Sequence, residues 1–244
     1  MERFPRVAVV LVTWKGAADT IECLESLLKS DYPNYQVIVC DNASPDDSVA
    51  EIRRWASSSD RAVTFVEYGR AEAEEAGPVQ SGGCQLTLIH TGENLGFAGG
   101  NNVALSYIKA RGDAKYIWLL NNDTVVAPDA LRRMVELAEG DSIIGIVGSK
   151  VLEYSNPDRV QALGGGRLIT WQGRTELLGA GTTDNGEAGD TMELDYVTGA
   201  SFLIRSKVID EIGLMDPNYF LYSEEVDWCL TARQRGWRLV CASS

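Results

Sequence analysis

Short apolar runs alternate with amphipathic segments along the first part of the chain. Residues 7–12 are continuously apolar and rich in β-branched side chains, which is typical of a parallel strand buried on both faces. Residues 19–28 carry apolar side chains three and four positions apart, so they predict an amphipathic helix. Residues 35–40 repeat the strand pattern, and residues 48–55 repeat the helical one. This order of strand, helix, strand and helix predicts an α/β fold with a parallel sheet.

The same two patterns continue as far as residue 150. Between Tyr68 and Gln85 the chain is polar, acidic and glycine-rich, so we interpret residues 68–85 as a surface insertion. Residues 1–150 are therefore predicted to form a doubly wound α/β half. Its further predicted elements are strands at 63–67, 87–90, 116–120 and 143–147 and helices at 101–110 and 128–138.

The pattern changes after residue 151, where glycines punctuate short segments. Loops and antiparallel strands are expected there, with strand-like segments at 167–171 and 193–197. Residues 224–235 return to the helical period, and Gly236 suits the position just after a helix. Residues 237–241 have the pattern of a final strand. We expect one domain with a second, smaller half at 151–244.

Composition narrows the classes of protein that fit this fold. The chain has 244 residues, of which 45% are hydrophobic and 23% charged, so it is long enough for a sizeable core. Its net charge of −13 opposes nucleic-acid binding. No run approaches the roughly 20 apolar residues that span a bilayer, and no secretory signal pattern opens the chain, so a cytoplasmic location is expected. The five cysteines are widely spaced and mostly lie in apolar segments, which favours core positions over disulfides or a metal site.

Polar residues follow four of the predicted strands, where ligands bind in open parallel sheets. Asp41 could accept hydrogen bonds from a base or a ribose, and Asp123 could offer a carboxylate oxygen to a divalent cation beside phosphates. Local structure explains the same residues: Asp41 to Pro45 is also typical of an Asx turn, and Asp123 could cap the segment that runs to Pro128. The glycines at 96–100 do not form a GxGxxG motif, so they are a weak phosphate signal. Spacing alone leaves these alternatives open.

Glu224, Glu225 and Asp227 gather at the start of the last predicted helix. Acidic residues stabilise a helix N-terminus by about 0.3–1 kcal/mol each, which is one interpretation. The other is catalysis, because residues 220–222 and Trp228 surround the carboxylates with apolar and aromatic surface, and desolvation raises a carboxyl pKa toward the range useful to a general base. His90, the single histidine, is expected to be structural.

Taken together, six motifs resemble the family 2 glycosyltransferases of the GT-A fold, in particular the branch that contains rhamnosyltransferases. The resemblance covers most of the chain, and the order and spacing of the motifs carry it. The motifs are Val12-Thr-Trp14, Cys40-Asp-Asn-Ala-Ser44, Asn94-Leu-Gly-Phe-Ala-Gly-Gly-Asn-Asn102, Leu119-Leu-Asn-Asn-Asp-Thr124, Val197-Thr-Gly-Ala200, and Ile212-Gly-Leu-Met-Asp216 leading to Phe220-Leu-Tyr-Ser-Glu-Glu-Val-Asp-Trp-Cys229.

The resemblance implies a fold and an activity. The fold is a mostly parallel, Rossmann-like sheet flanked by helices, with a nucleotide-binding half at 1–150 and a smaller antiparallel portion on the acceptor side. The activity is transfer of a hexosyl or rhamnosyl group from a UDP- or dTDP-linked sugar to an acceptor hydroxyl, with inversion and in one displacement. Synthesis of a polysaccharide or cell-surface glycan is the implied role. A glycan or a lipid-linked sugar is the implied acceptor, and the latter would bring peripheral contact with the inner face of the membrane, although no basic amphipathic helix supports it.

The resemblance also implies roles for individual residues. Asn121, Asn122 and Asp123 occupy the place of the DXD motif, so Asp123 would hold Mg²⁺ or Mn²⁺ on the donor diphosphate. Glu225 falls at the position of the base, with Glu224 and Asp227 in support. The remaining implied positions are Asp41, Thr13 and Trp14 at the nucleobase, Asn94, Gly96 and Asn101 along the nucleotide, and Asn121 at the ribose.

The sequence departs from the pattern of its relatives at three places. Asn121 replaces the first aspartate of the DXD motif, and Glu225 replaces the usual aspartate at the base. Relatives usually continue past the final strand into further helix, often with a histidine near the metal, so we expect this chain to be truncated at its C-terminus. Two alternatives stay open: an inactive nucleotide-sugar-binding module, which a missing C-terminal segment favours, and a sugar nucleotidyltransferase. The latter class normally opens with a glycine-rich phosphate loop, whereas Thr13-Trp-Lys-Gly16 supplies one lysine and one glycine.

Overall fold

The structure is a computed structural model that describes residues 4–58, 64–77, 86–186 and 192–243. Residue 63 of the predicted strand 63–67, residues 78–85 of the predicted insertion, and Cys84 lie outside these ranges. Within them, no helix is long and apolar enough to cross a membrane.

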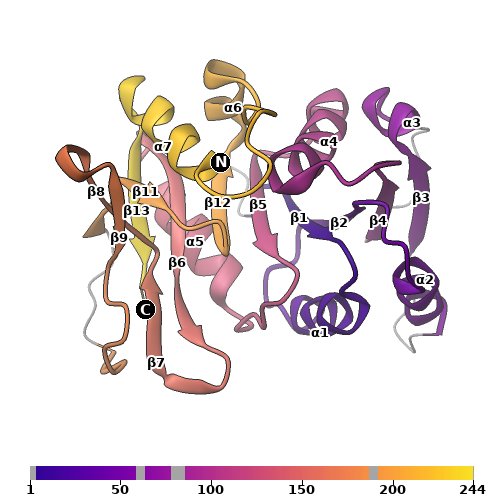
Figure 1. The fold of residues 1–244 in the computed structure, drawn as a ribbon, viewed down its shortest axis with the longest axis horizontal. Coiled ribbons are helices and arrows are strands. Elements are labelled where there is room, and N and C mark those ends of the chain that lie inside the picture. The colour runs from indigo at the N-terminus through magenta and orange to yellow at the C-terminus, as the bar shows by residue number, and fades with distance from the viewer. Residues whose placement is uncertain (1–3, 59–63, 78–85, 187–191, 244) are drawn as a thin grey trace.

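Ten strands of the described chain form one sheet in the order β10-β13-β6-β12-β5-β1-β2-β4-β3, with β7 paired to β6 (Figure 1). β1 (Val7–Thr13) lies between β2 (Tyr35–Asp41) and β5 (Tyr116–Asn121), and all three are parallel. β4 (Leu86–His90) and β3 (Phe65–Gly69) extend the parallel part. The chain moves outward from β1 in one direction and then returns to its other side at β5, so the strand order reverses here, as a doubly wound sheet requires.

Helices cover both faces of this sheet (Figure 1). Val7, Val9 and Leu11 of β1 pack with one layer of helices, while Ala8 and Val10 pack with the other. Because both faces are covered, a continuous apolar run was the correct strand signal. The first layer contains α1 (Ala17–Leu27), α2 (Ser48–Ser58) and α5 (Ala130–Gly140), and the second contains α3 (Arg70–Glu74), α4 (Gly96–Arg111), α6 (Ser206–Ile212) and α7 (Glu224–Gln234).

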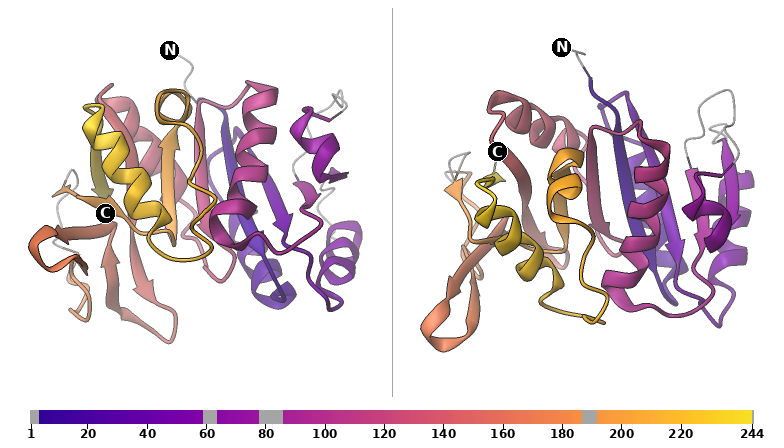
Figure 2. Two further views of the ribbon diagram at one scale, coloured as in Figure 1. Left: turned by 45° about the horizontal axis from the view of Figure 1, so that its top comes forward. Right: turned by 90° about the horizontal axis from the view of Figure 1, so that it is seen from above.

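The second half adds antiparallel strands, as the sequence predicts. β12 (Ser201–Arg205) runs antiparallel between β5 and β6 (Ile144–Glu153), and β13 (Arg238–Ala242) is parallel to β6. The C-terminal part of β6 pairs with β7 (Asn156–Leu163). Figure 2 shows β8 and β9 at the end of the molecule away from α2 and α3. The remaining elements are β8 (Gly165–Ile169), the 3-10 turn η1 (Thr170–Gln172), β9 (Arg174–Leu177), β10 (Met192–Glu193) and β11 (Tyr196–Val197), with β11-β8-β9 forming a small antiparallel sheet.

Several predicted elements differ from the structure. The strand-like segment 167–171 ends at Ile169 and continues as the turn η1, and the segment 193–197 is divided between β10 and β11, which belong to different sheets. The helix predicted at 101–110 begins at Gly96, because its glycines bring the helix against β1 rather than forming a turn: a Cβ on Gly100 would lie 2.8 Å from Val12 Cγ1. Part of the predicted surface insertion, residues 70–74, is helix α3, and its Ala73 is buried in the core. The core positions expected for the cysteines are confirmed in the described ranges, since Cys23, Cys40, Cys229 and Cys241 are buried.

Candidate active site

The carboxyl ends of the central strands bring distant polar residues to one edge of the sheet. Thr13 stands opposite Asp41 in the β1–β2 register, and Val12 stands opposite Asn121 in the β1–β5 register. Asp41 in turn stands opposite His90 of β4. The predicted meeting of residues near 13, 41 and 121 at one edge is therefore present in the structure.

Thr13 and Asn122 are occupied by contacts within the protein. The hydroxyls of Thr13 and Thr20 lie 3.0 Å apart, and the Asn122 amide donates to Thr20 Oγ1 at 2.9 Å. Thr13 is fully buried. These bonds tie the turn after β5 to the start of α1, so both side chains fix the position of the neighbouring Asp123. Trp14 is the accessible member of this group: its indole is 48% exposed, and Lys15 Nζ lies 4.4 Å from the ring.

Asp41 forms the local turn that its sequence suggests. Its two carboxylate oxygens accept a shared hydrogen bond from Ser44 N at 3.3 Å, and the residue is buried. A carboxylate has about four acceptor positions, so this single donor leaves capacity for others. The next residue, Asn42, was not among the candidate residues, yet its amide donates to Gly96 O at 2.8 Å and joins the end of β2 to the start of α4.

The three residues predicted to lie along the nucleotide are tied to protein groups. Asn94 Oδ1 accepts from Gly96 N at 3.1 Å. Gly96 has φ +70°, and a Cβ there would lie 2.1 Å from Phe220 O. Asn101 is buried, and its amide donates to Phe97 O at 2.9 Å within α4. Gly96 thus permits the close approach of residue 220 to α4, and Asn101 makes a bond within the first turns of that helix, while contact with a nucleotide stays a prediction.

Asp123 is exposed in the turn after β5 and lines a cavity of about 580 Å³ on the face that α1 and α5 cover. On the floor of this cavity, Trp118 Nε1 and Ser149 Oγ both donate to Ser201 Oγ, at 2.9 and 2.7 Å. Tyr154 lines the same cavity, and its hydroxyl donates to Glu22 of α1 at 2.8 Å. The volume lies within the range of small-molecule sites, so there is room for a sugar ring beside Asp123.

A divalent cation at Asp123 would need ligands from a substrate. In the described ranges, no three His, Cys, Asp or Glu side chains come together as a metal cage. Mg²⁺ is often held by one or two carboxylates together with substrate phosphates. A single exposed carboxylate at a strand end fits that mode of binding.

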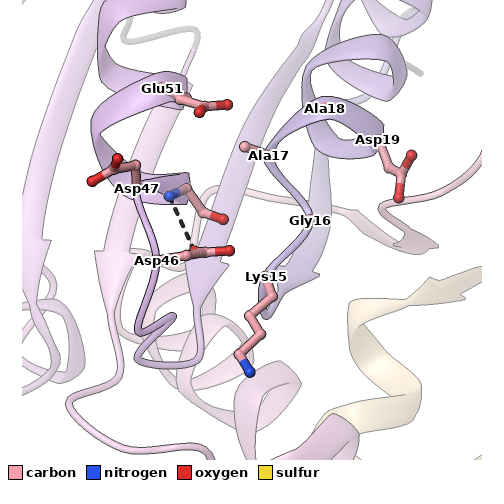
Figure 3. Close-up of a pocket in the computed structure, with 9 residues that line it drawn as sticks. Lys15, Gly16, Ala17, Ala18, Asp19, Asp46, Asp47 and Glu51 are labelled. Carbon is pink, nitrogen blue, oxygen red and sulfur yellow. Dashed lines mark hydrogen bonds between the residues drawn. The ribbon is translucent and has the colours of Figure 1, made fainter.

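A second cavity, of about 420 Å³, lies between the starts of α1 and α2 (Figure 3). Lys15 and four carboxylates line it, those of Asp19, Asp46, Asp47 and Glu51. The hydrogen bond from Ser48 lowers the pKa of Asp46, which stays ionised. This excess of negative charge opposes a diphosphate, so the cavity does not suit a phosphate group.

Glu224 and Glu225 begin α7 after a strained turn. Tyr222 and Ser223 have φ +72° and +73°, a region that costs non-glycine residues about 1–3 kcal/mol each and that clusters at functional sites. Phe220 O, just before this turn, accepts a hydrogen bond from Phe97 N at the start of α4. Because Asn42 ties the start of α4 to the end of β2, the chain enters this turn from the carboxyl edge of the sheet.

The glutamate pair is poorly solvated. Glu224 is only 4% exposed, and in the described structure the Oε2 atoms of both residues are buried without a hydrogen-bond partner. Burial raises the pKa of both carboxyl groups, and for Glu224 the neighbouring charge of Glu225 adds to the effect. Asp227 differs from the pair because it is exposed. Backbone N–H groups at the start of α7 lower the pKa of both carboxyl groups in part, as helix capping does, but burial outweighs them. A pKa raised in this way lies toward the range useful to a general base, and the role as base stays a prediction.

The mostly parallel, doubly wound sheet with its small antiparallel portion has the GT-A fold. A model of the glycosyltransferase like family 2 matches residues 5–244, and the chain belongs to this family. Among curated proteins, the chain is 21% identical over 229 residues to the low-salt glycan biosynthesis hexosyltransferase Agl10 of Haloferax volcanii, covering 93% of this chain and 62% of the relative. It is also 26% identical over 155 residues to the putative glycosyltransferase EpsE of Bacillus subtilis, covering 63% of this chain and 46% of that protein.

Solved structures share the fold. The mannosyltransferase PcManGT from Pyrobaculum calidifontis, in complex with GDP-Man and Mn²⁺, superposes with a TM-score of 0.64 at 19% identity, over 98% of this chain and 55% of that one. S. aureus TarS 1-349 in complex with UDP-GlcNAc superposes with a TM-score of 0.61 at 13% identity, over 97% of this chain and 55% of that one. The chain thus spans less than two thirds of each of these relatives.

Proposed function

We propose that this chain transfers a sugar from a UDP- or dTDP-linked donor to an acceptor hydroxyl with inversion. The observation that carries the proposal is the pair of buried, unpartnered carboxylate oxygens of Glu224 and Glu225 at the sheet edge that also carries Asp123. Two relatives with this fold have structures with GDP-Man and Mn²⁺ or with UDP-GlcNAc, which supports a nucleotide sugar as the donor class. Glycan or cell-surface polysaccharide synthesis is the proposed role, with a glycan or lipid-linked acceptor and a rhamnosyl or other hexosyl group transferred.

In this proposal the donor lies along the carboxyl edge from β2 to β5. Trp14 and Asp41 bind the nucleobase, and Asn121 faces the ribose. Asp123 holds Mg²⁺ or Mn²⁺ against the donor phosphates. That cation supplies Lewis-acid chemistry, because it offsets the negative charge on the departing diphosphate.

The chemical step follows from the burial of the glutamate pair. The acceptor oxygen forms a bond to the anomeric carbon as the bond from that carbon to the diphosphate oxygen breaks. The acceptor proton passes to the carboxylate of Glu225, whose raised pKa makes it a stronger base than an exposed glutamate. Glu224, the more buried of the two, supports it from the adjacent position.

Thermal unfolding with UDP-, dTDP- and GDP-sugars, each with and without Mn²⁺, tests this function. A ligand that binds only the folded state stabilises it by RT ln(1 + [L]/Kd), about 2.7 kcal/mol at 100 times Kd. We expect one nucleotide to raise the Tm in a Mn²⁺-dependent way, and Asp123→Asn to remove the Mn²⁺ dependence. Absence of a shift with every donor would count against the proposal.

A transfer assay and Tm measurements with nucleoside triphosphates, added to this experiment, separate the alternatives. A binding module without transfer gives the Tm shift but no sugar transfer or donor hydrolysis. A nucleotidyltransferase instead binds a nucleoside triphosphate after β1. The acid-lined cavity at Lys15 makes that second alternative unfavourable.

A further inference from the structure

The loop between α6 and α7, residues 213–223, is held from a distant part of the chain. Asn102 of α4 bonds to both backbone groups of Met215: its amide donates to Met215 O at 2.8 Å, and its Oδ1 accepts from Met215 N at 3.1 Å. These residues are 113 positions apart in the sequence. The Asn102 side chain therefore makes the same pair of backbone hydrogen bonds to Met215 that a residue of a neighbouring strand would make.

A second contact holds the loop closer to the glutamates. Phe97 N, at the start of α4, donates to Phe220 O at 2.8 Å. The first N–H groups of a helix have no partner within the helix, so the loop satisfies one of them. Gly96 permits the approach, because a Cβ there would lie 2.1 Å from the same carbonyl oxygen.

The start of α4 is itself anchored to the carboxyl edge of the sheet, where the donor is proposed to lie; we call it the donor edge. Asn42, after β2, donates its amide to Gly96 O at 2.8 Å and its backbone N–H to Thr13 O at 2.8 Å. On the other side, Trp228 of α7 donates to Gly213 O at 3.0 Å and closes the far end of the loop. Contacts therefore run without interruption from the ends of β1 and β2, through α4, to the loop that precedes Glu224.

We propose that Asn102 is a positioning residue, which sets the loop 213–223 and thereby the glutamate pair at a fixed place relative to the donor edge. Backbone strain gives this contact its importance. Tyr222 and Ser223, with φ +72° and +73°, persist in an unfavourable conformation only while the surrounding structure holds them there. Loss of the anchor lets this turn relax and admits water to the glutamates. The inference rests on the proposed function where it concerns the base, but the anchoring itself does not.

Hydrogen exchange on the whole chain tests the anchoring without any substrate. Asn102→Ala should speed exchange of amides in residues 213–224. The matched control is Asn218→Ala, which removes an exposed asparagine of the same loop that bonds within the loop, to Asp216. The control should leave exchange near 215 unchanged. Because Asn102→Ala could lower folding yield, Asn102→Asp is the second variant; it keeps the acceptor for Met215 N and loses the donor to Met215 O, so the same acceleration is expected.

Kinetics then separate positioning from a merely structural role. Misplacing the base should lower kcat roughly 10- to 100-fold while the KM for the donor stays within about twofold. Hydration of the glutamates should lower their raised pKa values, so the acidic limb of the kcat profile should move to lower pH. Asn218→Ala should show neither change.

Different results would refute the anchoring of the loop by Asn102 and its role in positioning the glutamates. Unchanged exchange in 213–224 for both Asn102 variants would overturn the anchoring. Faster exchange with unchanged kcat and an unmoved acidic limb would overturn the positioning role. A wild-type chain that neither binds nor transfers a sugar would refute the proposed function alone, and the exchange comparison would still decide whether Asn102 is the anchor.

Discussion

Glu225 is the residue whose replacement most directly tests the chemistry. Glu225→Gln keeps the shape of the side chain but removes the proton acceptor, so transfer should fall by about 10²- to 10⁴-fold. Donor binding should be retained, because the change removes a base rather than a contact with the nucleotide. Transfer rates and donor-induced Tm shifts measured on the same preparation give both quantities. Loss of donor binding would contradict the role as base.

The control for that experiment is Asp227→Asn. Asp227 is exposed and lies in the first turn of α7, so it shares the helix start but not the buried environment of the pair. Its loss should leave transfer within about threefold of wild type, and a fall as deep as that of Glu225→Gln would show that the helix start, rather than the buried carboxylate, matters.

Burial of the pair also makes stability depend on pH. The folded pKa values of Glu224 and Glu225 lie above the unfolded value of about 4.3, so the folded state binds protons more tightly than the unfolded state. This stabilising contribution is complete below the unfolded pKa and is lost as the pH rises through the folded one. Glu224→Gln, which cannot ionise, should remove the part of that decline that Glu224 contributes, so its stability should fall less steeply with pH than that of wild type. Urea denaturation of wild type and Glu224→Gln, in steps of about one pH unit from pH 4 upward, measures the free energy of unfolding of each. Parallel curves of stability against pH for the two proteins would exclude the effect.

The types of residue at the site could be predicted, but their contacts could not. Asp41, Asp123 and the glutamates follow strands or begin a helix, positions that the sequence pattern identifies. Asn42 and Asn102 stand within the same motifs, yet their partners Gly96 and Met215 lie 54 and 113 positions away. Only the folded chain shows which backbone groups an asparagine reaches.

At the scale of elements, the close approach of α4 to β1 depends on Gly100. A Cβ there would lie 2.8 Å from Val12 Cγ1 and 2.9 Å from the Asn42 amide, so neighbouring groups must shift. We expect Gly100→Ala to destabilise the chain by about 1–3 kcal/mol despite the better helix propensity of alanine. The free energy of unfolding in urea measures it.

Gly140 provides the matched comparison within a helix. It ends α5, and a Cβ there would meet nothing within 4 Å. Gly140→Ala should therefore stabilise by about 0.4–1 kcal/mol, through a less disordered unfolded chain. If Gly100→Ala and Gly140→Ala changed the free energy of unfolding in the same direction, crowding of the Cβ at residue 100 would not explain its effect.

Elements with a strong period were predictable, and elements built on glycine were not. The strands around β1 and helix α5 match their apolar patterns within a few residues, because burial on fixed faces imposes those patterns. The start of α4 is different: Gly96-Phe-Ala-Gly-Gly has low helix propensity and indicates a turn. Tertiary packing against Val12 and Phe220, which no local pattern shows, makes it helical.

At the scale of the whole molecule, the two halves share one sheet. β12, from the second half, lies between β5 and β6 of the first and pairs with both. Its Phe202 stacks on Trp228 of α7, while Ser201 accepts from the Trp118 indole of β5. Periodicity predicted the strands and the change to short, glycine-punctuated segments after residue 151. It did not predict the insertion of β12, which depends on pairing between residues about 80 positions apart, such as Trp118 and Ser201.

This insertion predicts how the chain unfolds. Residues 1–150 alone lack the strand that separates β5 from β6, so Trp118 and Leu119 of β5 would lose their antiparallel neighbour and expose apolar surface at a cost of about 25 cal/mol per Å². We expect the whole chain to unfold in one cooperative transition and the fragment 1–150 to show none, as measured by urea titration with circular dichroism and tryptophan fluorescence. A sharp transition for the fragment would mean that the nucleotide-binding half is an independent folding unit, and that β12 merely docks onto it.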